Sequence, residues 1–388
     1  MAEVLSAASL LLDLIRIPSV SSLSNRPLIE FIESVLQPGG WHVRELPYSD
    51  AAGVEKVNLI AIPPGQPANN FSVDLAFVCH TDTVPYNGAW PQAIHPEIRD
   101  GQIHGCGACD VKGFLACVLA AAQSVPAIQF ASTVALVFTA EEEIGCLGAR
   151  RLVDERVLRA RHVVVGEPTS LHPAPAGKGY GLAEVRVLGK EAHSAYPTQG
   201  TSAIYHAARL IGRIEKFAES LKKPAHSASN SLFDPPYTTL NIGMIEGGTA
   251  KNIVAGECTF LLEWRPVPGE AAGLVLDAVR NIVEELRHDD PAFSCILQVK
   301  REQPGFETSE ASPLLRRWTE LSRQRAIGVS FGTEAPWLAA LAEDVIVAGP
   351  GDMRTAHSER ECVPIAELER CVAYFKDLLL HPLHSSPE

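Results

Sequence analysis

Four nearly continuous apolar runs constrain the fold of this chain more than any other feature of its sequence. They are Ser72 to Cys79, Thr133 to Thr139, His162 to Gly166 and Val345 to Ala348. Strands that are buried on both faces have such unbroken runs, whereas half-exposed strands alternate. Helical patterns separate the runs, for example the alanine-rich segment that follows Asp110 and stops at Pro126. This alternation predicts an α/β domain in which a mostly parallel sheet is covered by helices on both faces.

The middle of the chain has a different pattern, which predicts a second domain. Leu182 to Leu188 alternates like a half-exposed strand, and a helical pattern follows from Ser202 to Leu221. Two strands, a helix and a last strand are then expected near Thr238 to Ile245, Val254 to Trp264, Glu270 to Arg287 and Phe293 to Val299. This β-α-β-β-α-β order is the ferredoxin-like split unit. We therefore expect residues 177–301 to be inserted into a domain built from residues 1–176 and 302–388.

Composition and charge exclude several classes of protein. A hydrophobic content of 46% with 20% charged residues is typical of a globular enzyme. The formal net charge of -13 and the 6% aromatic content argue against a nucleic-acid partner. No stretch reaches the roughly 18 apolar residues of a membrane span, so no membrane partner is expected. The nine scattered cysteines predict reduced thiols in a cytoplasmic protein, and the pair Cys106 and Cys109 lacks a second pair at zinc-finger spacing.

Candidate metal ligands come directly after the predicted strands. His80 follows the run FVC, residues 141–143 follow VALVFTA, Glu167 follows HVVVG, and His357 lies in the loop after VIVAGPG. In open α/β sheets, ligands gather outside the carboxyl ends of the strands, so these segments reach one edge. A two-metal hydrolase needs a few nitrogen and oxygen ligands per ion, a bridging water and one shared carboxylate. Asp110, in GACDVKG, is the natural bridge.

Neighbouring residues complete this hypothesis. Asp82, in CHTD, is predicted to accept a hydrogen bond from the His80 imidazole and fix its tautomer. Within the triple 141–143, one carboxylate can ligate while its neighbour acts as general base. Taken singly, Asp110 could be only a helix N-cap, and the triple a solvated helix start. The joint placement of these residues favours the metal site.

Motifs for other chemistries are weak. The chain has no G-x-S-x-G nucleophile elbow and no G-x-x-x-x-G-K-[ST] phosphate loop. Gly105 and Gly107 begin like a dinucleotide fingerprint, but Asp110 takes the place of the third glycine. Serine hydrolases and nucleotide enzymes are therefore disfavoured.

Motifs along almost the whole chain resemble those of the co-catalytic zinc deacylases and exopeptidases. That family includes acetylornithine deacetylase, succinyl-diaminopimelate desuccinylase, aminoacylases and glutamate carboxypeptidases. The motifs are LIRIPSVS, CHTDTVP, GACDVKG, TAEEEIG, VVGEPT, EAHSAYP, GGTAKNIVA, EWRPVPG, GTEAP and AHSERE. The resemblance implies a metal-dependent amidohydrolase that removes the acyl group from a small N-acyl amino acid with water.

By position, the resemblance implies two divalent metal ions, Zn²⁺ or alternatively Co²⁺. The implied ligands are His80 and Glu167 for one ion, Glu143 and His357 for the other, and Asp110 for both. Glu142 is implied to be the general base and later the proton donor, with Asp82 behind the imidazole.

The resemblance also implies functions for the inserted domain. It implies a homodimer that forms through this domain, with His193 reaching an active site, in its own subunit or the partner's, to steady the scissile carbonyl. Asn252 and Arg265 match positions that contact substrate, and the alternatives for them are a turn residue and a surface strand charge. Glu334, in FGTEAPWL, is a candidate contact for a cationic amino-acid end.

Two stretches look most like the acetylornithine deacetylases of the family, which implies hydrolysis of N2-acetyl-L-ornithine to L-ornithine and acetate, as in arginine biosynthesis. They are YTTLNIGMIEGGTAKNIVAGECTFLLEWRPVPG and FGTEAPWL. Glu141 replaces the usual aspartate of the acidic triple, and Ser-Ala-Tyr follows His193, so the substrate stays open. Desuccinylase, acetylcitrulline deacetylase, aminoacylase and dipeptidase activities are the alternatives. A non-catalytic metal-binding protein on this scaffold is disfavoured because every ligand position is filled.

Overall fold

The computed structural model describes residues 5–66, 71–222, 231–271 and 273–383. The chain forms two compact units. Unit 1 comprises residues 1–175, 308–327 and 333–388, and unit 2 comprises residues 176–307 and 328–332. The expected boundary at residue 301 falls inside strand β12, Ser294–Gln303. Unit 2 also gains residues 328–332, because the short strand β14 (Gly328–Val329) pairs beside β8 (Ala176–Gly177).

Unit 1 contains a six-stranded sheet in the order β1-β2-β6-β3-β7-β15. Its strands are His42–Ser49 (β1), Glu55–Ile62 (β2), Val134–Thr139 (β6), Ser72–His80 (β3), Arg159–Val165 (β7) and Ala342–Val347 (β15). The last four strands in this order run parallel, whereas β2 is antiparallel to both of its neighbours. Three of the four apolar runs, β3, β6 and β7, lie side by side in the middle of the sheet, which confirms the predicted mostly parallel sheet.

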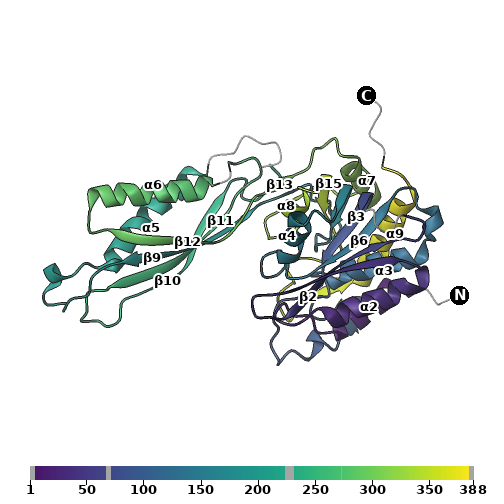
Figure 1. The fold of residues 1–388 in the computed structure, drawn as a ribbon, viewed down its shortest axis with the longest axis horizontal. Coiled ribbons are helices and arrows are strands. Elements are labelled where there is room, and N and C mark those ends of the chain that lie inside the picture. The colour runs from purple at the N-terminus through teal and green to yellow at the C-terminus, as the bar shows by residue number, and fades with distance from the viewer. Residues whose placement is uncertain (1–4, 67–70, 223–230, 272, 384–388) are drawn as a thin grey trace. The chain divides into compact units, whose positions relative to one another are not determined.

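Helices cover both faces of this sheet. They are Ala7–Arg16 (α1), Arg26–Leu36 (α2), Lys112–Ser124 (α3), Leu147–Asp154 (α4), Pro313–Ser322 (α7), Ala335–Leu338 (α8) and Ile365–Leu380 (α9). α1, α3 and α9 pack together in the main core, where the ring of Phe375 lies 5.0 Å from that of Phe114 and 4.8 Å from that of Phe77 on β3. Figure 1 shows α4 and α8 on the side of the sheet away from α3 and α9. This arrangement confirms the predicted layers.

Short strands complete the connections in both units. A small sheet in unit 1 contains Cys362–Pro364 (β16), Gln102–His104 (β5) and Glu97–Arg99 (β4). In unit 2, Phe306–Glu307 (β13) pairs with the other edge of β8. The small sheet in unit 1 brings the segment after His357 next to the segment that leads into Asp110.

Unit 2 is an antiparallel sheet with two helices on one face. The strand order is Thr239–Gly247 (β10), Glu257–Arg265 (β11), Tyr180–Leu188 (β9) and Ser294–Gln303 (β12). Helices α5 (Ala203–Ser220) and α6 (Leu274–Asp289) lie over it, as Figure 1 shows. Ala183, Val185 and Val187 alternate inward from β9 toward these helices and are fully buried. The chain order β9-α5-β10-β11-α6-β12 confirms the predicted split unit.

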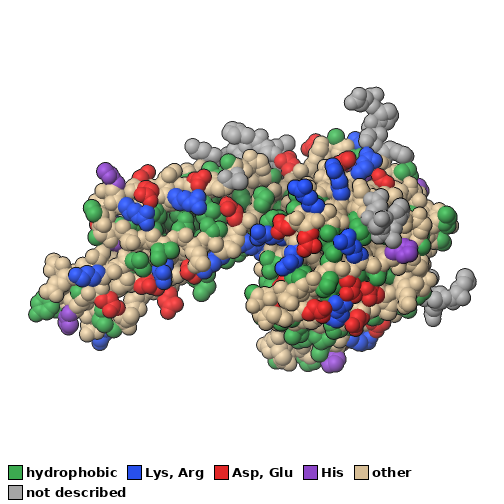
Figure 2. Space-filling view, viewed as in Figure 1, with side chains coloured by type: hydrophobic (Ala, Val, Ile, Leu, Met, Phe, Trp, Pro, Cys, Tyr) green, Lys and Arg blue, Asp and Glu red, His purple; other side chains and the backbone are tan. Residues whose placement is uncertain are grey.

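Charged side chains of both signs are spread over the surface drawn in Figure 2. The most continuously apolar helix, α3, is buried in the core from Lys112 to Ala122. Within the described part of the chain, no helix combines the length and the apolar character that a membrane span requires.

Candidate metal centre

The carboxyl ends of three neighbouring parallel strands meet at one edge of the unit 1 sheet. His80 is the last residue of β3 and pairs with Thr139, the last residue of β6. Glu143 lies in the turn after β6, and Glu167 follows β7 by two residues. Asp110 reaches the same edge from the loop before α3. The sheet therefore converts residues that are far apart in sequence into one cluster, as the positions of the apolar runs predict.

The five candidate ligands form two groups that share one carboxylate. Donor atoms of His80, Asp110 and Glu167 all lie within 4.8 Å of one another, and so do those of Asp110, Glu143 and His357. The His80 Nε2 atom is 3.1 Å from Asp110 Oδ1, and the His357 Nε2 atom is 3.1 Å from Asp110 Oδ2. The His357 Nε2 atom is also 3.3 Å from Glu143 Oε2. Asp110 thus offers one oxygen to each group.

Buried oxygen atoms in this cluster lack partners. Glu143 Oε1 and Glu167 Oε1 are inaccessible to water, and no described residue donates a hydrogen bond to them. Burying a carboxylate oxygen without a partner is costly unless a cation lies beside it. Imidazole and carboxylate ligands suit zinc, cobalt or manganese. The residues present therefore fit a pair of divalent cations.

The pKa values of the cluster report the same excess of negative charge. Burial raises the pKa of Glu167 well above its usual range, and it also raises the pKa of Glu143. Burial acts on Asp110 in the same direction, but its contacts with His357 and His80 outweigh it and hold the pKa of Asp110 below its usual value. The Asp110 and Glu143 contacts raise the pKa of His357 to about 10. Bound divalent cations would reverse the penalty on the two glutamates.

Asp82 contacts the cluster differently from the prediction. The His80 Nδ1 atom lies 2.9 Å from the backbone carbonyl of Asp82, whereas the Asp82 carboxylate is 3.7 Å from the ring. That carboxylate accepts hydrogen bonds from the backbone N–H groups of Glu142 (3.0 Å) and Glu143 (3.3 Å) and from the Ser21 hydroxyl (2.6 Å). The prediction that the Asp82 carboxylate accepts a hydrogen bond from the His80 ring is wrong, because the carboxylate accepts these other hydrogen bonds instead. Asp82 therefore orients the imidazole with its main chain and fixes the acidic turn with its side chain.

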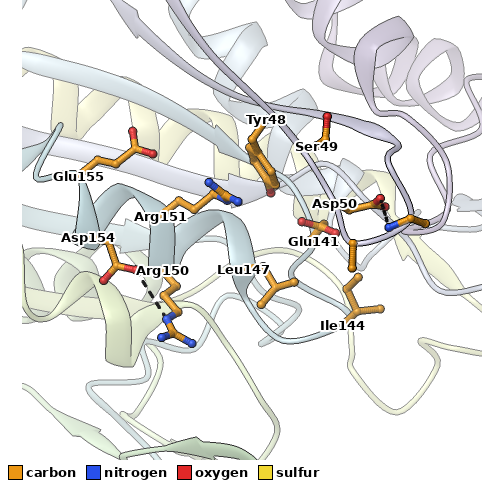
Figure 3. Close-up of a pocket in the computed structure, with 12 residues that line it drawn as sticks. Tyr48, Ser49, Asp50, Glu141, Ile144, Leu147, Arg150, Arg151, Asp154 and Glu155 are labelled. Atoms are coloured by element: carbon orange, nitrogen blue, oxygen red, sulfur yellow. Dashed lines mark hydrogen bonds and ion pairs between the residues drawn. The ribbon is translucent and has the colours of Figure 1, made fainter.

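The three adjacent glutamates point to different partners. Glu143 faces His357, while Glu142 accepts a hydrogen bond of 3.2 Å from the Cys146 thiol. Burial raises the pKa of Glu142 to about 8. Glu141 has a φ of 61° and lines a separate cavity of about 560 Å³ beside Tyr48, shown in Figure 3. This divergence separates the three charges without requiring all of them to face one site.

Comparisons with known proteins decide the family. The model of Peptidase family M20/M25/M40 matches residues 76–381. The chain belongs to this family. An acetylornithine deacetylase of Myxococcus xanthus is 42% identical over 371 residues, which cover 96% of each chain. This M20 protein is therefore a hydrolase that acts on amide bonds.

Solved structures share its fold at low identity. Aminopeptidase PepT from Bacillus cereus has a TM-score of 0.76 at 21% identity, over 96% of this chain and 97% of that chain. The YXEP protein of Bacillus subtilis, described as a dinuclear metal-binding peptidase of the M20 family, has a TM-score of 0.70 at 14% identity, over 98% of each chain. At these identities the likeness establishes the fold of the M20 chain and nothing finer.

Glu361 contacts the candidate ligand cluster, and sequence reasoning missed it. It is 1% exposed, and its Oε1 atom accepts hydrogen bonds of 3.2 Å from the backbone N–H groups of both Cys109 and Asp110. Helix α3 begins at Lys112, with Val111 at its N-cap, so Asp110 is not the helix cap considered above. Glu361 thus fixes the backbone that presents the shared carboxylate. The only signal was its place in AHSERE, four residues after His357.

The cysteine pair is not part of either ligand group. Cys106 and Cys109 are free and buried. The Cys109 thiol lies 3.7 Å from Glu361 Oε1, and the Cys106 thiol lies 3.9 Å from the Val84 carbonyl. Both cysteines lie in the loop that leads to Asp110, and their thiols contact other segments of unit 1.

The predicted substrate residues of unit 2 fall into two places. His193 pairs with Ile253 in an isolated antiparallel bridge, and the Ser194 N–H donates to the Asn252 carbonyl at 2.9 Å, so His193 and Asn252 lie together. Both side chains are exposed. Arg265 lies at the opposite end of β11, where its guanidinium bonds Glu263 at 2.8 Å and stacks 4.3 Å from the Tyr180 ring centre. Within unit 2 the structure does not bring Arg265 to the other two.

Glu334 belongs to unit 1 and is fully buried just before α8. Neither of its carboxylate oxygens has a hydrogen bond of normal geometry among the described residues. Burial raises its pKa to about 7, against the opposing effects of His80 and Thr139. Glu334 is therefore a buried acidic group in the neighbourhood of His80, and among the described residues it has no cationic partner of its own.

Proposed function

We propose that this protein hydrolyses N2-acetyl-L-ornithine to L-ornithine and acetate, as a step of arginine biosynthesis. The observation that carries the proposal is its 42% identity, over 96% of both chains, to the acetylornithine deacetylase of Myxococcus xanthus. The donor groups at the sheet edge support hydrolysis of an amide, since they combine two possible cation sites with a buried carboxylate, Glu142, beside them.

We propose that two divalent cations bind at this edge, Zn²⁺ first and Co²⁺ as the alternative. His80 and Glu167 would hold one, Glu143 and His357 the other, and Asp110 both. The partnerless oxygens of Glu143 and Glu167 support this assignment. When bound, such ions polarise the acyl carbonyl and make a water molecule acidic enough to attack it at neutral pH.

Glu142 is the proposed general base and acid. Its carboxylate takes a proton from the attacking water as the carbon–oxygen bond forms. It then gives that proton to the ornithine nitrogen as the carbon–nitrogen bond breaks, so acetate and the free amine leave. The Asp82 carboxylate accepts hydrogen bonds from the backbone N–H groups of Glu142 and Glu143, which fixes the position of the base relative to the neighbouring ligand, Glu143.

Substrate recognition is proposed to combine Glu334 with residues of unit 2. A buried carboxylate that has no cationic partner of its own among the described residues suits the side-chain ammonium group of ornithine. His193 is proposed to stabilise the oxyanion that forms on the acyl carbonyl. Asn252 and Arg265 are proposed as further substrate contacts.

A homodimer through unit 2 is also proposed. Strand β10 lies at the edge of its sheet and exposes Met244 (67%) and Ile245 (57%), while Tyr205 on α5 is 75% exposed. An apolar edge strand with unpaired backbone groups is a ready surface for pairing with a second copy. A cytoplasmic location is proposed because all nine cysteines are free, and all but Cys362 are buried.

A substrate panel tests the proposed function. Purified protein would be assayed for metal content and then for turnover of N2-acetyl-L-ornithine with added zinc or cobalt. Succinyl-diaminopimelate, N-acetylcitrulline, other N-acyl amino acids and dipeptides complete the panel. We expect the highest kcat/KM for acetylornithine. A higher value for another substrate would replace it, and bound metal without any turnover would support a non-catalytic protein.

A further inference from the structure

We propose that Cys146 is a positioning residue for the reaction, because its thiol holds the Glu142 carboxylate in the orientation that proton transfer requires. This inference rests on the proposed role of Glu142 as general base. The Cys146 Sγ atom lies 3.2 Å from Glu142 Oε1, and the Cys146 backbone N–H donates to the Glu142 carbonyl at 2.9 Å. The two residues are therefore joined through both main chain and side chain.

The surroundings leave the thiol little freedom to move. Cys146 is fully buried. Its φ of 55° places it in the left-handed region, which a side-chain-bearing residue occupies only when neighbouring contacts hold it there. This conformation is part of the turn that connects β6 to α4, so the direction of the thiol is set by the turn.

That turn is itself pinned to the sheet. Asn58 on β2 accepts a hydrogen bond from the Ala140 N–H and donates one to the Gly148 carbonyl, each at 3.0 Å. A Cβ on Gly148 would lie 2.3 Å from the Ala140 carbonyl oxygen, so the close approach needs glycine. The Asp82 carboxylate also accepts a hydrogen bond from the Glu142 N–H. The turn is therefore held at Ala140, at Glu142 and at Gly148.

The consequence concerns the side-chain rotamers of Glu142. A glutamate side chain has several rotamers, and a general base acts only from those that reach the water and the leaving nitrogen. A thiol on Oε1 restrains this rotation and leaves Oε2 to carry the proton. Because a thiol is a weak donor, it orients the carboxylate without competing strongly with the reacting groups.

Kinetics of three variants test the role. Cys146→Ala should lower kcat about fivefold, the effect of losing one ordinary hydrogen bond, with KM within about twofold of wild type. Cys146→Ser restores a donor and should recover most of the loss. Cys371→Ala, which removes another fully buried thiol, from α9, is the matched control and should leave kcat unchanged. A Cys146→Ala kcat within twofold of wild type, or a serine variant no faster than the alanine variant, would overturn the proposal.

A spectroscopic readout tests the contact without activity. The S–H stretching band of Cys146 can be isolated as the Raman difference between wild type and Cys146→Ala. We expect a hydrogen-bonded position in wild type and a shift of this band to higher frequency in Glu142→Ala. A band that ignores Glu142→Ala overturns this inference alone, whereas a wild-type protein inactive on every N-acyl substrate overturns the proposed function.

Discussion

The two units present their proposed functional residues in opposite ways. In unit 1, His80, Asp110 and Glu167 are each at most 5% exposed, and their donor atoms crowd together. In unit 2, His193 and Asn252 are exposed and lie on two loops that meet in an isolated bridge. A buried cluster of carboxylates needs compensation from something that binds there, so its chemistry can be argued from physics alone. Exposed side chains are solvated and need no bound group to compensate them, so their proposed roles depend on the resemblance to the family.

Removing the shared ligand should give the largest effect. Asp110→Asn keeps the size of the side chain but takes away the charge that both ligand groups share. We expect the loss of at least one metal equivalent and activity below about one thousandth of wild type. Elemental analysis and acetylornithine turnover check both outcomes. A variant that retains both metal and activity would exclude Asp110 as the bridge.

Substitution of the proposed general base, Glu142, should give the next largest effect. Unlike substitution of Asp110, it should leave the metal content unchanged. Glu142→Gln preserves the shape but cannot accept the proton, so kcat should fall about 10²- to 10⁴-fold with unchanged metal content. Single-turnover kinetics on metal-loaded protein provide the measurement. Glu141→Gln is the matched control, since Glu141 faces the separate cavity of Figure 3 and should change kcat less than about threefold. Equal losses in the two variants would contradict the assignment.

Substitution of an exposed residue of unit 2 should change the reaction rate but not the stability or the metal content. His193→Ala should lower kcat about 10²- to 10³-fold, the effect of losing an oxyanion donor. The melting temperature should not move by more than about 1 °C, because surface substitutions away from special features are nearly neutral. Normal turnover in this variant would exclude His193 from the chemistry. Changed metal content would show that His193 also affects the ligand cluster.

A smaller effect is expected on substrate preference. We attribute this preference to Glu334, which is buried, and not to an exposed residue. Glu334→Gln removes the charge of a fully buried side chain that has no cationic partner of its own within the described residues. The ratio of kcat/KM for N-acetylornithine to that for neutral N-acetylmethionine should fall about 10- to 100-fold, because the ammonium loses its counter-charge. The same fall for both substrates would instead mean that Glu334 supports the structure of the site.

These cases show which parts of the site a sequence can predict. The convergence of His80, Glu143 and Glu167 could be predicted because each lies just after an apolar run that becomes a strand, and parallel strands end at one edge. Asp110 comes from the loop before α3, so no apolar run places it. The contacts of Asp82, Cys146 and Glu361 could not be predicted. They depend on turns with unusual backbone angles, as at Cys146, or on segments that meet only after folding, since Glu361 lies 251 residues from Asp110. Apolar patterning encodes strands and helices, but it carries no information on which backbone N–H a carboxylate will meet.

The same reasoning explains the fold and its small errors. The split unit could be predicted because half-exposed strands alternate and amphipathic helices separate them. The boundary expected at residue 301 lies inside β12, which continues through polar side chains to Gln303, and unit 2 extends to residue 307. Residues 328–332 join unit 2 through two backbone pairs of β14 with β8, and no side-chain pattern marks them.

The smallest expected effect is a pH dependence of stability that arises in unit 2. Lys178, in unit 2, donates to the carbonyls of Pro235 and Tyr237 at 2.8 Å each, and burial lowers its pKa to about 8. The unfolded chain keeps this amine protonated up to about pH 10.4, so between these values the unfolded state binds more protons. The free energy of unfolding of wild type relative to Lys178→Met should therefore rise with pH, by about 1 to 2 kcal/mol after solvent screening. Denaturant titrations at pH 7 and 9.5 give the difference, and a relative stability that falls with pH would mean that the amine stays charged when folded.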